Sequence, residues 1–516
     1  MHKALVLSDV VAEILAHLKQ KSLVALTTTC KVLSSPALDL LWRAMSSLDP
    51  LYQTLPEGVW TRDADGNLVV GTAAPIMGDW VRFTMYASRI RELSFADGAA
   101  QIRPTLLELV KRFMPSLPHP PLPCLLTLRI THEYSDAEVA LCFTTLVHPG
   151  LRALDVMWPS PQTGASMLSV MQLSCPNIQT LVLGKANGLL PMAVLFSHLQ
   201  KLVCDDPDTT LDMRMLMDLA QVPHLHHLSI TSQFASSSFI DSTEAETESM
   251  FHGLQELSLE NVTGVFALAH FLRVAKLHSL RSLSLKYTLC DQPAGEIRAL
   301  AEGIASHSDL LKLSLCSREP ITDAVTERDL LALASLTRLR EVDLNDVLSY
   351  ANTECGTFTL PLLWGDVQKM RIDCAVWRAS KRGVVCGLQF LDKLVLRCPR
   401  LTHLHIAMRV THIPELSWER RDKERHEPLF LSLSVPASRM DTNDYHGIAQ
   451  YLTGICSGDV WITCEGGKDA RSSRLCDKWR YVDKWIACII TDRIARRHPL
   501  GGGHLVIATA EELEER

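Results

Sequence analysis

A short apolar motif recurs through most of this chain of 516 residues. Its unit is an apolar residue, two variable residues, an apolar residue, one variable residue and a third apolar residue, as in LRSLSL from Leu280. Thirteen such units occur between Ile90 and Phe430, at a mean step of about 28 residues, which indicates a stacked solenoid. The units start at Ile90, Leu125, Leu151, Ile178, Leu199, Leu225, Leu254, Leu280, Leu310, Leu339, Val367, Leu401 and Phe430.

The alternating apolar positions of each unit predict a short strand with one buried face. Between the strands lie helical patterns, such as Ile297, Leu300 and Ile304 at i, i+3 and i+7. A strand and a helix in about 28 residues resemble the longer leucine-rich repeats. We therefore predict an α/β fold, an irregular leucine-rich-repeat solenoid with parallel strands on its concave face and helices on its convex face. The arc is expected to be irregular because the steps vary from 21 to 35 residues.

A cysteine and a proline precede two of the predicted strands, in CPNIQTLVL from Cys175 and CPRLTHLHI from Cys398. Proline lacks the backbone N–H and disfavours helical geometry in the residue before it. We therefore expect a helix to end at each of these cysteines.

The rest of the chain divides around the repeats. Near the C-terminus, Trp479, Val482, Ile486 and Ile489 form one stripe of an amphipathic helix, which we interpret as a cap on the last repeat. Polar insertions at 232–249, 352–366 and 417–428 are interpreted as solvated loops. The predicted organisation is an N-terminal helical domain (1–48), a linker with a possible hairpin (49–79), the solenoid (80–445), a terminal repeat with its capping helix (446–500) and a tail (501–516).

Composition narrows the class of protein. The chain is 47% hydrophobic and 21% charged, with a net charge of −7 and no basic stripe, so nucleic acid is not an expected partner. No apolar run reaches the roughly 20 residues of a membrane span, and no signal peptide is recognised, so no membrane partner is expected. The 15 cysteines include no C-x-x-C pair and are interpreted as buried thiols. A soluble cytoplasmic or nuclear protein is expected.

Residues 6–45 do not fit the repeat and predict short amphipathic helices. Val10, Ile14 and Leu18 recur at i, i+4 and i+8, after Ser8 or Asp9 as N-cap. A second helix is predicted over 21–33, with Leu23, Leu26, Cys30 and Leu33 on one stripe, and SSPALDLLWRAM follows it. Forty residues bury little core alone, so this element is expected to pack against a partner or the next segment.

These helices resemble an F-box, the module that binds the Skp-type adaptor of cullin–RING ubiquitin ligases. The family pattern is matched in register up to Cys30 and again at Leu41-Trp42-Arg43. DWVRFTMYASRIRELSF, from Asp79, is similar to the start of the repeats in fungal F-box proteins with leucine-rich repeats. The resemblance implies an adaptor-binding surface composed of Leu7, Asp9, Val10, Ile14, Leu18, Leu23, Leu26, Cys30, Leu33 and Trp42.

No local signature of catalysis, phosphate binding or metal binding is convincing, so no enzyme activity, cofactor or metal is expected. His224, His226 and His227 cluster, and His403 and His405 share one face of a strand, but zinc requires further ligands. We interpret them as surface side chains. Three cysteines spaced twelve apart, Cys374, Cys386 and Cys398, are interpreted as packing residues.

The residue between the last two apolar positions of each unit should point out of the concave face. Four consecutive units carry serine there, which is either a floor for close approach of a partner or a residue that fits a crowded parallel sheet. The predicted target-binding residues are Arg129, Asp155, Ser229, Ser258, Ser284, Ser314, Asp343, Arg371 and His405.

Together these features predict the substrate-recognition subunit of an SCF-type ubiquitin ligase, whose F-box binds the adaptor and whose repeats bind a target protein. The alternative is a leucine-rich-repeat interaction scaffold without a ligase role. A Cys/His hydrolase is a distant third.

Overall fold

The fold is seen in a computed structural model, which describes residues 8–29, 31–95, 102–113, 120–185, 188–234, 251–275, 277–288, 293–318, 325–347, 359–373, 386–415, 431–435, 438–456, 460–464 and 470–497. Two compact units divide these residues, one reaching Gln233 and including 251–254, the other comprising Phe234 and the residues from Gln255 onward. Leu7, Cys30, Cys374, the tail from 501, the insertion 417–428 and residues 235–249 and 352–358 of the other two insertions lie outside the described residues. The interpretation of 352–366 as a solvated loop is wrong from Thr359 onward, because this part contains the helical turn Leu360–Leu363 and buries Leu360 and Trp364.

Three helices open the first unit: α1 (Ser8–Ala16), α2 (Gln20–Thr29) and α3 (Lys31–Arg43). Both α2 and α3 contribute to the stretch 21–33 that was predicted to be helical, and Cys30 between them lies outside the described residues. The hydroxyls of Thr27 and Thr28 donate to the carbonyls of Val24 and Ala25, at 2.7 and 2.9 Å. Such bonds compete with the helical ladder, and branched side chains lose freedom in a helix, so these threonines contribute little to the stability of α2. The small core of this helical module is formed by Val11, Leu15, Leu23 and Ala37, with Leu26, Leu33, Leu40 and Leu41 packed against it.

The module joins the repeats through a short strand. The segment after α3 continues into β1 (Ala44–Met45), which pairs in parallel with β4 (Glu92–Phe95). Between them lie α4 (Asp49–Tyr52), the antiparallel pair β2 (Trp60–Arg62) and β3 (Leu68–Val70), the turn η2 (Met77–Asp79) and α5 (Trp80–Ala87). The predicted linker, 49–79, therefore contains a hairpin, and much of it forms regular secondary structure.

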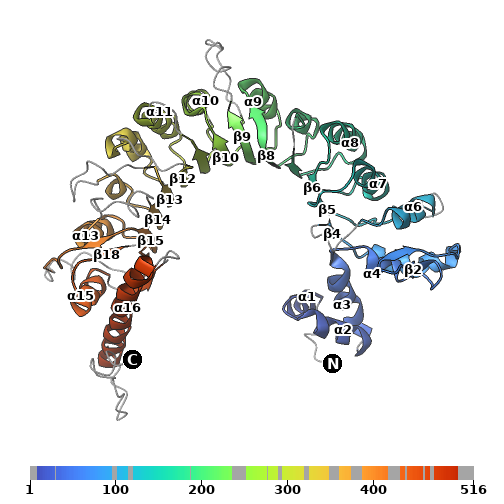
Figure 1. Cartoon of the computed structure of the whole chain (residues 1–516), viewed down its shortest axis with the longest axis horizontal. Coiled ribbons are helices and arrows are strands. Elements are labelled where there is room, and N and C mark those ends of the chain that lie inside the picture. Colours follow the sequence, from blue (N-terminus) through green and yellow to red (C-terminus); the bar gives the residue numbers. More distant parts are fainter. Residues whose placement is uncertain are drawn as a thin grey trace. The chain divides into compact units, whose positions relative to one another are not determined.

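The remainder of the first unit consists of strands in sequence order, and a helix or helical turn follows each strand from β4 to β8 (Figure 1). The strands are β4, β5 (Thr127–Ile130), β6 (Ala153–Met157), β7 (Thr180–Gly184), β8 (Lys201–Leu211) and β9 (His227–Phe234). The helices are α6 (Pro104–Phe113), α7 (Asp136–Leu146), α8 (Pro161–Ser174), η4 (Leu190–Leu195) and α9 (Met213–Ala220).

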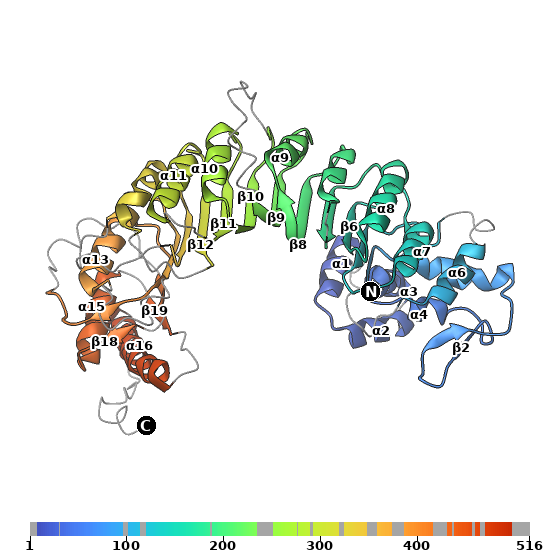
Figure 2. The same ribbon diagram turned by 45° about the horizontal axis from the view of Figure 1, so that its top comes forward.

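The second unit repeats this arrangement (Figure 2). Its strands are β10 (Glu256–Val262), β11 (Ser282–Tyr287), β12 (Lys312–Ser317), β13 (Glu341–Asn345), β14 (Lys369–Asp373), β15 (His403–Ile406), β17 (Leu431–Ser434) and β19 (Val460–Thr463). Between them lie α10 (Val265–Val274), α11 (Pro293–Ala305), η5 (Glu327–Ser335), η6 (Leu360–Leu363), the pair β16 (Arg409–Val410) and β18 (Arg439–Met440), α13 (Leu388–Arg397) and α15 (Tyr445–Ile455). The helix α16 (Ala470–Arg497) follows β19.

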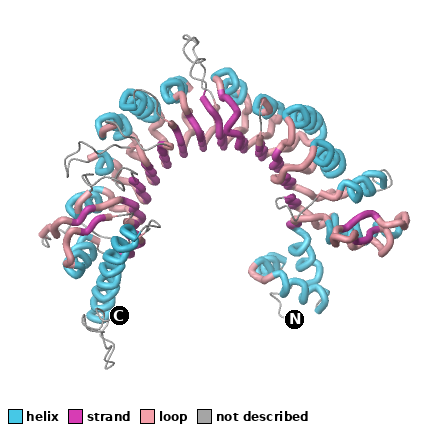
Figure 3. The backbone as a smooth tube through the Cα atoms, viewed as in Figure 1, coloured by secondary structure: helices cyan, strands magenta, loops and turns pink. Residues whose placement is uncertain are grey.

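Within the repeats of each unit the parallel strands lie on one side and the helices that connect them on the other (Figure 3). Neighbouring strands pair in parallel, with motif residues in register, as for Leu283 with Leu313 and Leu285 with Leu315. The predicted α/β solenoid with parallel strands and helices on opposite faces is therefore confirmed. The motif explains the core, because its three apolar positions are at most 2% exposed in all thirteen repeats wherever they are described. Leu300 and Ile304 of α11 are buried as the helical pattern predicted.

The first twelve repeats also bury the residue three positions before the motif, a position that the sequence pattern revealed only for the two cysteines. In most of these repeats its carbonyl accepts from the N–H of the first motif residue, as between His148 and Leu151 at 3.0 Å. Cys175 and Cys398 are the C-caps of α8 and α13, so the predicted helix ends are confirmed. The residues at this fourth position, each at most 6% exposed, are Ala87, Leu122, His148, Cys175, Phe196, Val222, Phe251, Leu277, His307, Leu336, Trp364 and Cys398.

The helix α16 packs against the last strand and helix of the second unit. Trp479, Val482 and Ile486 are buried along one stripe. The Trp479 indole N–H donates to the Ser438 carbonyl at 3.2 Å, and the Asp483 carboxylate accepts from the Ile462 N–H at 3.1 Å. The helix therefore packs on the last strand of the sheet, and its role as a cap stays a prediction.

Candidate functional site

The face of each sheet turned away from the helices, here called the open face, carries the side chains between the last two motif positions. In the first unit Ser94, Arg129 and Asp155 are register partners on successive strands, and Ser229 occupies the same motif position on β9. Burial raises the pKa of Asp155, and the Arg129 charge opposes that shift. In the second unit the register continues through Ser258, Ser284, Ser314, Asp343, Arg371, His405 and Ser434.

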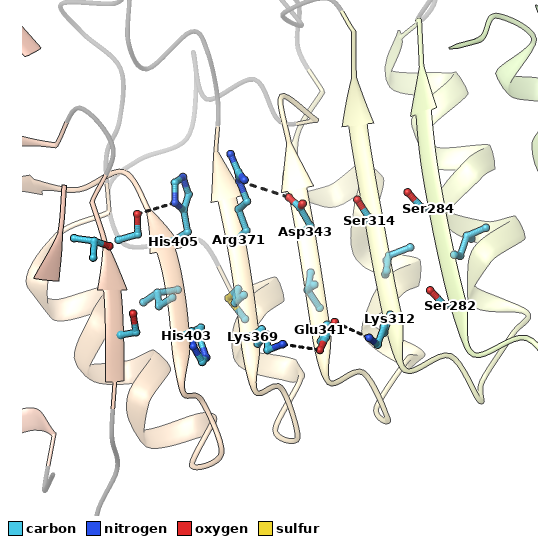
Figure 4. A pocket seen from close by; sticks show the side chains of 18 residues that line it. Ser282, Ser284, Lys312, Ser314, Glu341, Asp343, Lys369, Arg371, His403 and His405 are labelled. Carbon is cyan, nitrogen blue, oxygen red and sulfur yellow. Dashed lines mark hydrogen bonds and ion pairs between the residues drawn. The ribbon is translucent and has the colours of Figure 1, made fainter. Parts of the chain in front are cut away.

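In the second unit the open face is hollowed between β11 and β19, with a volume of about 470 Å³. Two rows of side chains line it (Figure 4). The first row follows the register just given, from Ser284 to Ser434. The second row lies two residues earlier on each strand and consists of Ser282, Lys312, Glu341, Lys369, His403 and Ser432.

The second row is organised by a shared carboxylate. Glu341 lies between two lysines on the neighbouring strands, with Nζ of Lys312 and Nζ of Lys369 each 3.1 Å from one of its oxygens. Burial raises the pKa of Glu341, but the hydrogen bonds and charges of the two lysines outweigh burial, so this pKa lies below its ordinary value. Glu341 therefore fixes the position of both ammonium groups on the open face, although each lysine side chain is more than half exposed.

The first row is organised around Arg371. Its guanidinium lies 4.0 Å from the Asp343 carboxylate and 3.9 Å from that of Asp373, and Asp373 is buried. Nε2 of His405 is 3.5 Å from the Asp373 carboxylate, while Nδ1 lies 2.9 Å from the Ser434 hydroxyl. Burial raises the pKa of Asp343, and the charges of Arg371 and His405 only partly counter this shift. A ligand must therefore compete with an existing charge network.

This network determines what the hollow can bind. Each of the three cations, Lys312, Lys369 and Arg371, lies within 4.0 Å of a carboxylate. A polyanion would meet the carboxylates of Glu341 and Asp343 at close range, where like charges repel strongly. The small serines at the edges admit close approach and offer hydroxyl donors and acceptors. The hollow therefore suits a protein segment of mixed charge.

An exposed tryptophan at the end of the second row was missed by the sequence analysis. Trp461 of β19 pairs in register with Ser432 and is 68% exposed. Tryptophan is enriched among the residues that dominate protein interfaces. The signal was hidden because VWIT at 460–463 lacks the first leucine of the motif.

A second surface lies on the helical module. Its helices use Val11, Leu15 and Leu23 for their own core and leave other apolar side chains in solvent. Val10 and Ile14 on α1 and Leu18 just after it are 37%, 47% and 36% exposed, on the i, i+4, i+8 stripe that the sequence predicts. Val24 on α2 and Val32 on α3 are more than half exposed. The stripe is available to a partner.

The remaining predicted adaptor-binding residues are placed differently. Leu23 is buried in the module, Leu26 and Leu33 pack against its core, and Trp42 stacks on Tyr86 of α5. These four side chains stabilise the module and its junction with the repeats. The backbone of Asp9 lies in α1, whereas Leu7 and Cys30 are outside the described residues.

Next to this junction lies an apolar stripe that the sequence analysis did not identify. Met77, Val81 and Met85 recur at i, i+4 and i+8 along η2 and α5 and are 57%, 66% and 44% exposed. Trp80, Phe83 and Ala87 of the same helix are buried. Both sets of residues recur at helical spacing within 77–87, so the sequence shows two apolar faces on one helix. Spacing alone does not say which of the two faces is buried.

The candidate metal ligands of the sequence are not brought together. Within the described ranges no group of three or more His, Cys, Asp or Glu side chains could hold a metal ion. Cys398 is buried and donates its thiol hydrogen toward the Trp364 carbonyl at 3.4 Å, while Cys386 is partly exposed. Among the helices described, none combines the length and apolar character needed to cross a membrane.

Comparisons with known proteins add little. The sequence matches no protein-family model and no curated protein sequence. Among solved structures, the chain is similar to an internalin, inlF, from Listeria monocytogenes strain 4b F2365. The two are 11% identical, the match covers 87% of this chain and 95% of the internalin chain, and the TM-score is 0.32. A similarity at this level says nothing about what either protein binds.

Proposed function

We propose that this chain is the substrate-recognition subunit of an SCF-type cullin–RING ubiquitin ligase. The helical module binds the Skp-type adaptor, and the hollow between β11 and β19 binds a target protein. The chain forms and breaks no bond itself and acts by bringing the target to the conjugating enzyme. The supporting observation is α1, which buries Val11 and Leu15 and leaves Val10 and Ile14 exposed.

An exposed stripe on so small a module supports a docking role. Its core of Val11, Leu15, Leu23 and Ala37 is too small to stabilise an isolated domain of about 40 residues. Burial of an apolar side chain contributes about 1.5–3 kcal/mol, so two or three residues of the stripe provide a substantial part of an interface. Their i, i+4 spacing suits a helical partner surface.

The adaptor half of the proposal is tested by binding of the full chain to a purified Skp-type adaptor. Ile14→Asp and Val10→Asp should each weaken binding by roughly tenfold to a hundredfold, because a charge replaces buried apolar area. Val170→Asp on α8 is the matched control, since Val170 is 54% exposed but outside the module. Circular dichroism verifies that each variant is folded.

Two outcomes contradict this role. If Ile14→Asp binds like the unmodified chain, the stripe is not the docking surface. The F-box pattern usually has proline at the position of Leu7. If the unmodified chain fails to retain the adaptor while a Leu7→Pro variant retains it, the ligase role falls and the scaffold function remains.

The target half is tested with the full chain carrying Ile14→Asp, which uncouples capture from turnover. A target of the hollow is retained by this chain and lost when Arg371→Glu is added. Arg338→Glu is the matched control, because Arg338 also pairs with an aspartate, Asp309, but does not line the hollow. Equal loss from both charge reversals would show that capture depends on net charge and not on the hollow.

A further inference from the structure

Two thiols meet where the terminal helix joins the last strand. Cys464 follows β19, and Cys476 lies in α16. Their Sγ atoms are 2.7 Å apart, and the Cys464 Sγ also lies 3.5 Å from the Val435 carbonyl oxygen. Cys464 is partly exposed, whereas Cys476 is buried.

The surroundings hold this pair in place. Immediately after Cys476, the Lys478 ammonium donates to the Met440 carbonyl at 3.1 Å, and the Trp479 indole N–H donates to the Ser438 carbonyl. On the strand side, the Ile462 N–H donates to Asp483 of the same helix. Both cysteines are therefore fixed by bonds between α16 and the last repeat that do not involve sulfur.

We propose that Cys464 and Cys476 are a redox modification site, at which a reversible disulfide fastens α16 to β19. The sulfurs need to approach by only about 0.7 Å to reach bonding distance, and their side chains already point at each other. The bond closes a loop across residues 465–475. The co-reactant is a small-molecule disulfide such as oxidised glutathione.

The reaction proceeds in two exchanges. The Cys464 thiol loses its proton to solvent, and its thiolate attacks one sulfur of the small disulfide, forming a mixed disulfide and releasing one thiolate. The Cys476 thiol then loses its proton and attacks the Cys464 sulfur, which releases the second thiolate. One small disulfide is reduced to two thiols, and the two cysteines are oxidised to one disulfide.

Accessibility sets the order and the rate. Cys464 reacts first because it is the partly exposed member of the pair. Burial, and then the hydrogen bond with Cys476, raise the pKa of Cys464 to about 12. Little thiolate is present at neutral pH, so closure is slow and accelerates as the pH rises. In a reducing compartment the pair remains as thiols until oxidant is added.

The test uses the folded full chain incubated with oxidised glutathione and digested without reduction. Peptide mass mapping should find a Cys464–Cys476 link that dithiothreitol removes. The link should be absent from Cys464→Ser and Cys476→Ser and retained in Cys488→Ser, the matched control on the same helix. Trypsin should cut α16 of the oxidised chain on the order of tenfold more slowly, because loop closure restrains local opening.

Two results would overturn the proposal. A stable glutathione adduct on Cys464 without the internal link would show that the second exchange fails. A link that forms and leaves trypsin cleavage of α16 unchanged would show that the bond does not fasten the helix. The unmodified chain alone decides both points, so a variant that fails to fold does not affect them. No adaptor or target takes part, and the result is independent of the proposed ligase role.

Discussion

The indole ring of Trp42 is stacked on the phenol ring of Tyr86, with 4.6 Å between the ring centroids and 25° between the ring planes. Trp42 closes α3, and Tyr86 belongs to α5, so this contact joins the helical module to the start of the repeats. Arg89 reinforces the junction through an ion pair with Asp39 and a 3.1 Å hydrogen bond to the Ser35 carbonyl. The module is thus fastened to the rest of the first unit by side chains of α3, of α5 and of Arg89 just after α5.

Trp42→Ala should loosen this junction. Loss of the stacked pair and of its buried area should lower the free energy of unfolding of the module by about 1–3 kcal/mol. Hydrogen exchange over α3 measures the effect. Met85→Ala on α5, adjacent to Tyr86 in sequence and 44% exposed, is the control and should leave α3 protection unchanged. Equal protection in both variants would argue against a coupled junction.

Trp364→Ala tests the fourth buried position of the repeat. The Trp364 side chain is fully buried, and its indole N–H donates to the Leu333 carbonyl at 3.0 Å. Its removal should cost about 3–5 kcal/mol, since it leaves a cavity and removes a buried hydrogen bond. Urea unfolding followed by circular dichroism gives the value.

Trp461→Ala is the matched control, because it removes the same side chain from a site that is 68% exposed. It should change the free energy of unfolding by less than about 0.5 kcal/mol. If the two substitutions cost the same, the fourth position is not part of the core.

The fold could be predicted from the sequence because the same apolar motif forms the buried face of the strand in every repeat. Leu283, Leu285 and their equivalents are apolar in every unit, so the sequence shows both the length of the repeat and the buried face of each strand. The fourth position could not be recognised in the sequence, because residues as different as Ala87, His148 and Trp364 are all buried there. The short strand β1 was also hidden, since Ala44 and Met45 carry no motif and gain their pairing from β4.

The candidate site was predictable only in part. Spacing predicted that Asp343, Arg371 and His405 share one face, which the strand register confirms. The buried partner Asp373 was not predicted, because it lies after the last motif position, where a residue can point either way. Trp461 was missed because its strand lacks the full motif. Periodicity identifies a face, whereas the partners of each side chain depend on strand pairing.

Substitution of Asp373 should lower the free energy of unfolding much more than substitution of Glu341, although both carboxylates pair with cations on the same sheet. The Asp373 side chain is 2% exposed, and Asp373→Ala leaves Arg371 and His405 without their buried partner, which should lower the free energy of unfolding by about 2–4 kcal/mol. The Glu341 side chain is 34% exposed, so Glu341→Ala should cost no more than about 1 kcal/mol. Urea unfolding of both variants checks the contrast, and a larger cost for Glu341 would contradict this account.

Stability should fall as the pH drops below about 6.5, in part because of two histidines at the fourth position of the repeat. Burial lowers the pKa of His148 and of His307, and the nearby His278 lowers that of His307 further. A histidine with a lower pKa in the folded state binds fewer protons there than in the unfolded chain. Its stabilising contribution is therefore complete above the unfolded pKa of about 6.5 and is lost as the pH falls toward the folded pKa.

The double variant His148→Gln, His307→Gln isolates this contribution, because glutamine keeps a donor and does not titrate. Urea unfolding at about pH 7.5 and pH 5.5 should show a smaller loss of stability for this variant than for the unmodified chain. Both chains share every carboxylate, so acidic groups cancel in the comparison. His17→Gln is the control, because the His17 side chain is 79% exposed and should leave the pH dependence unchanged. An identical pH dependence in all three chains would exclude the buried histidines as its source.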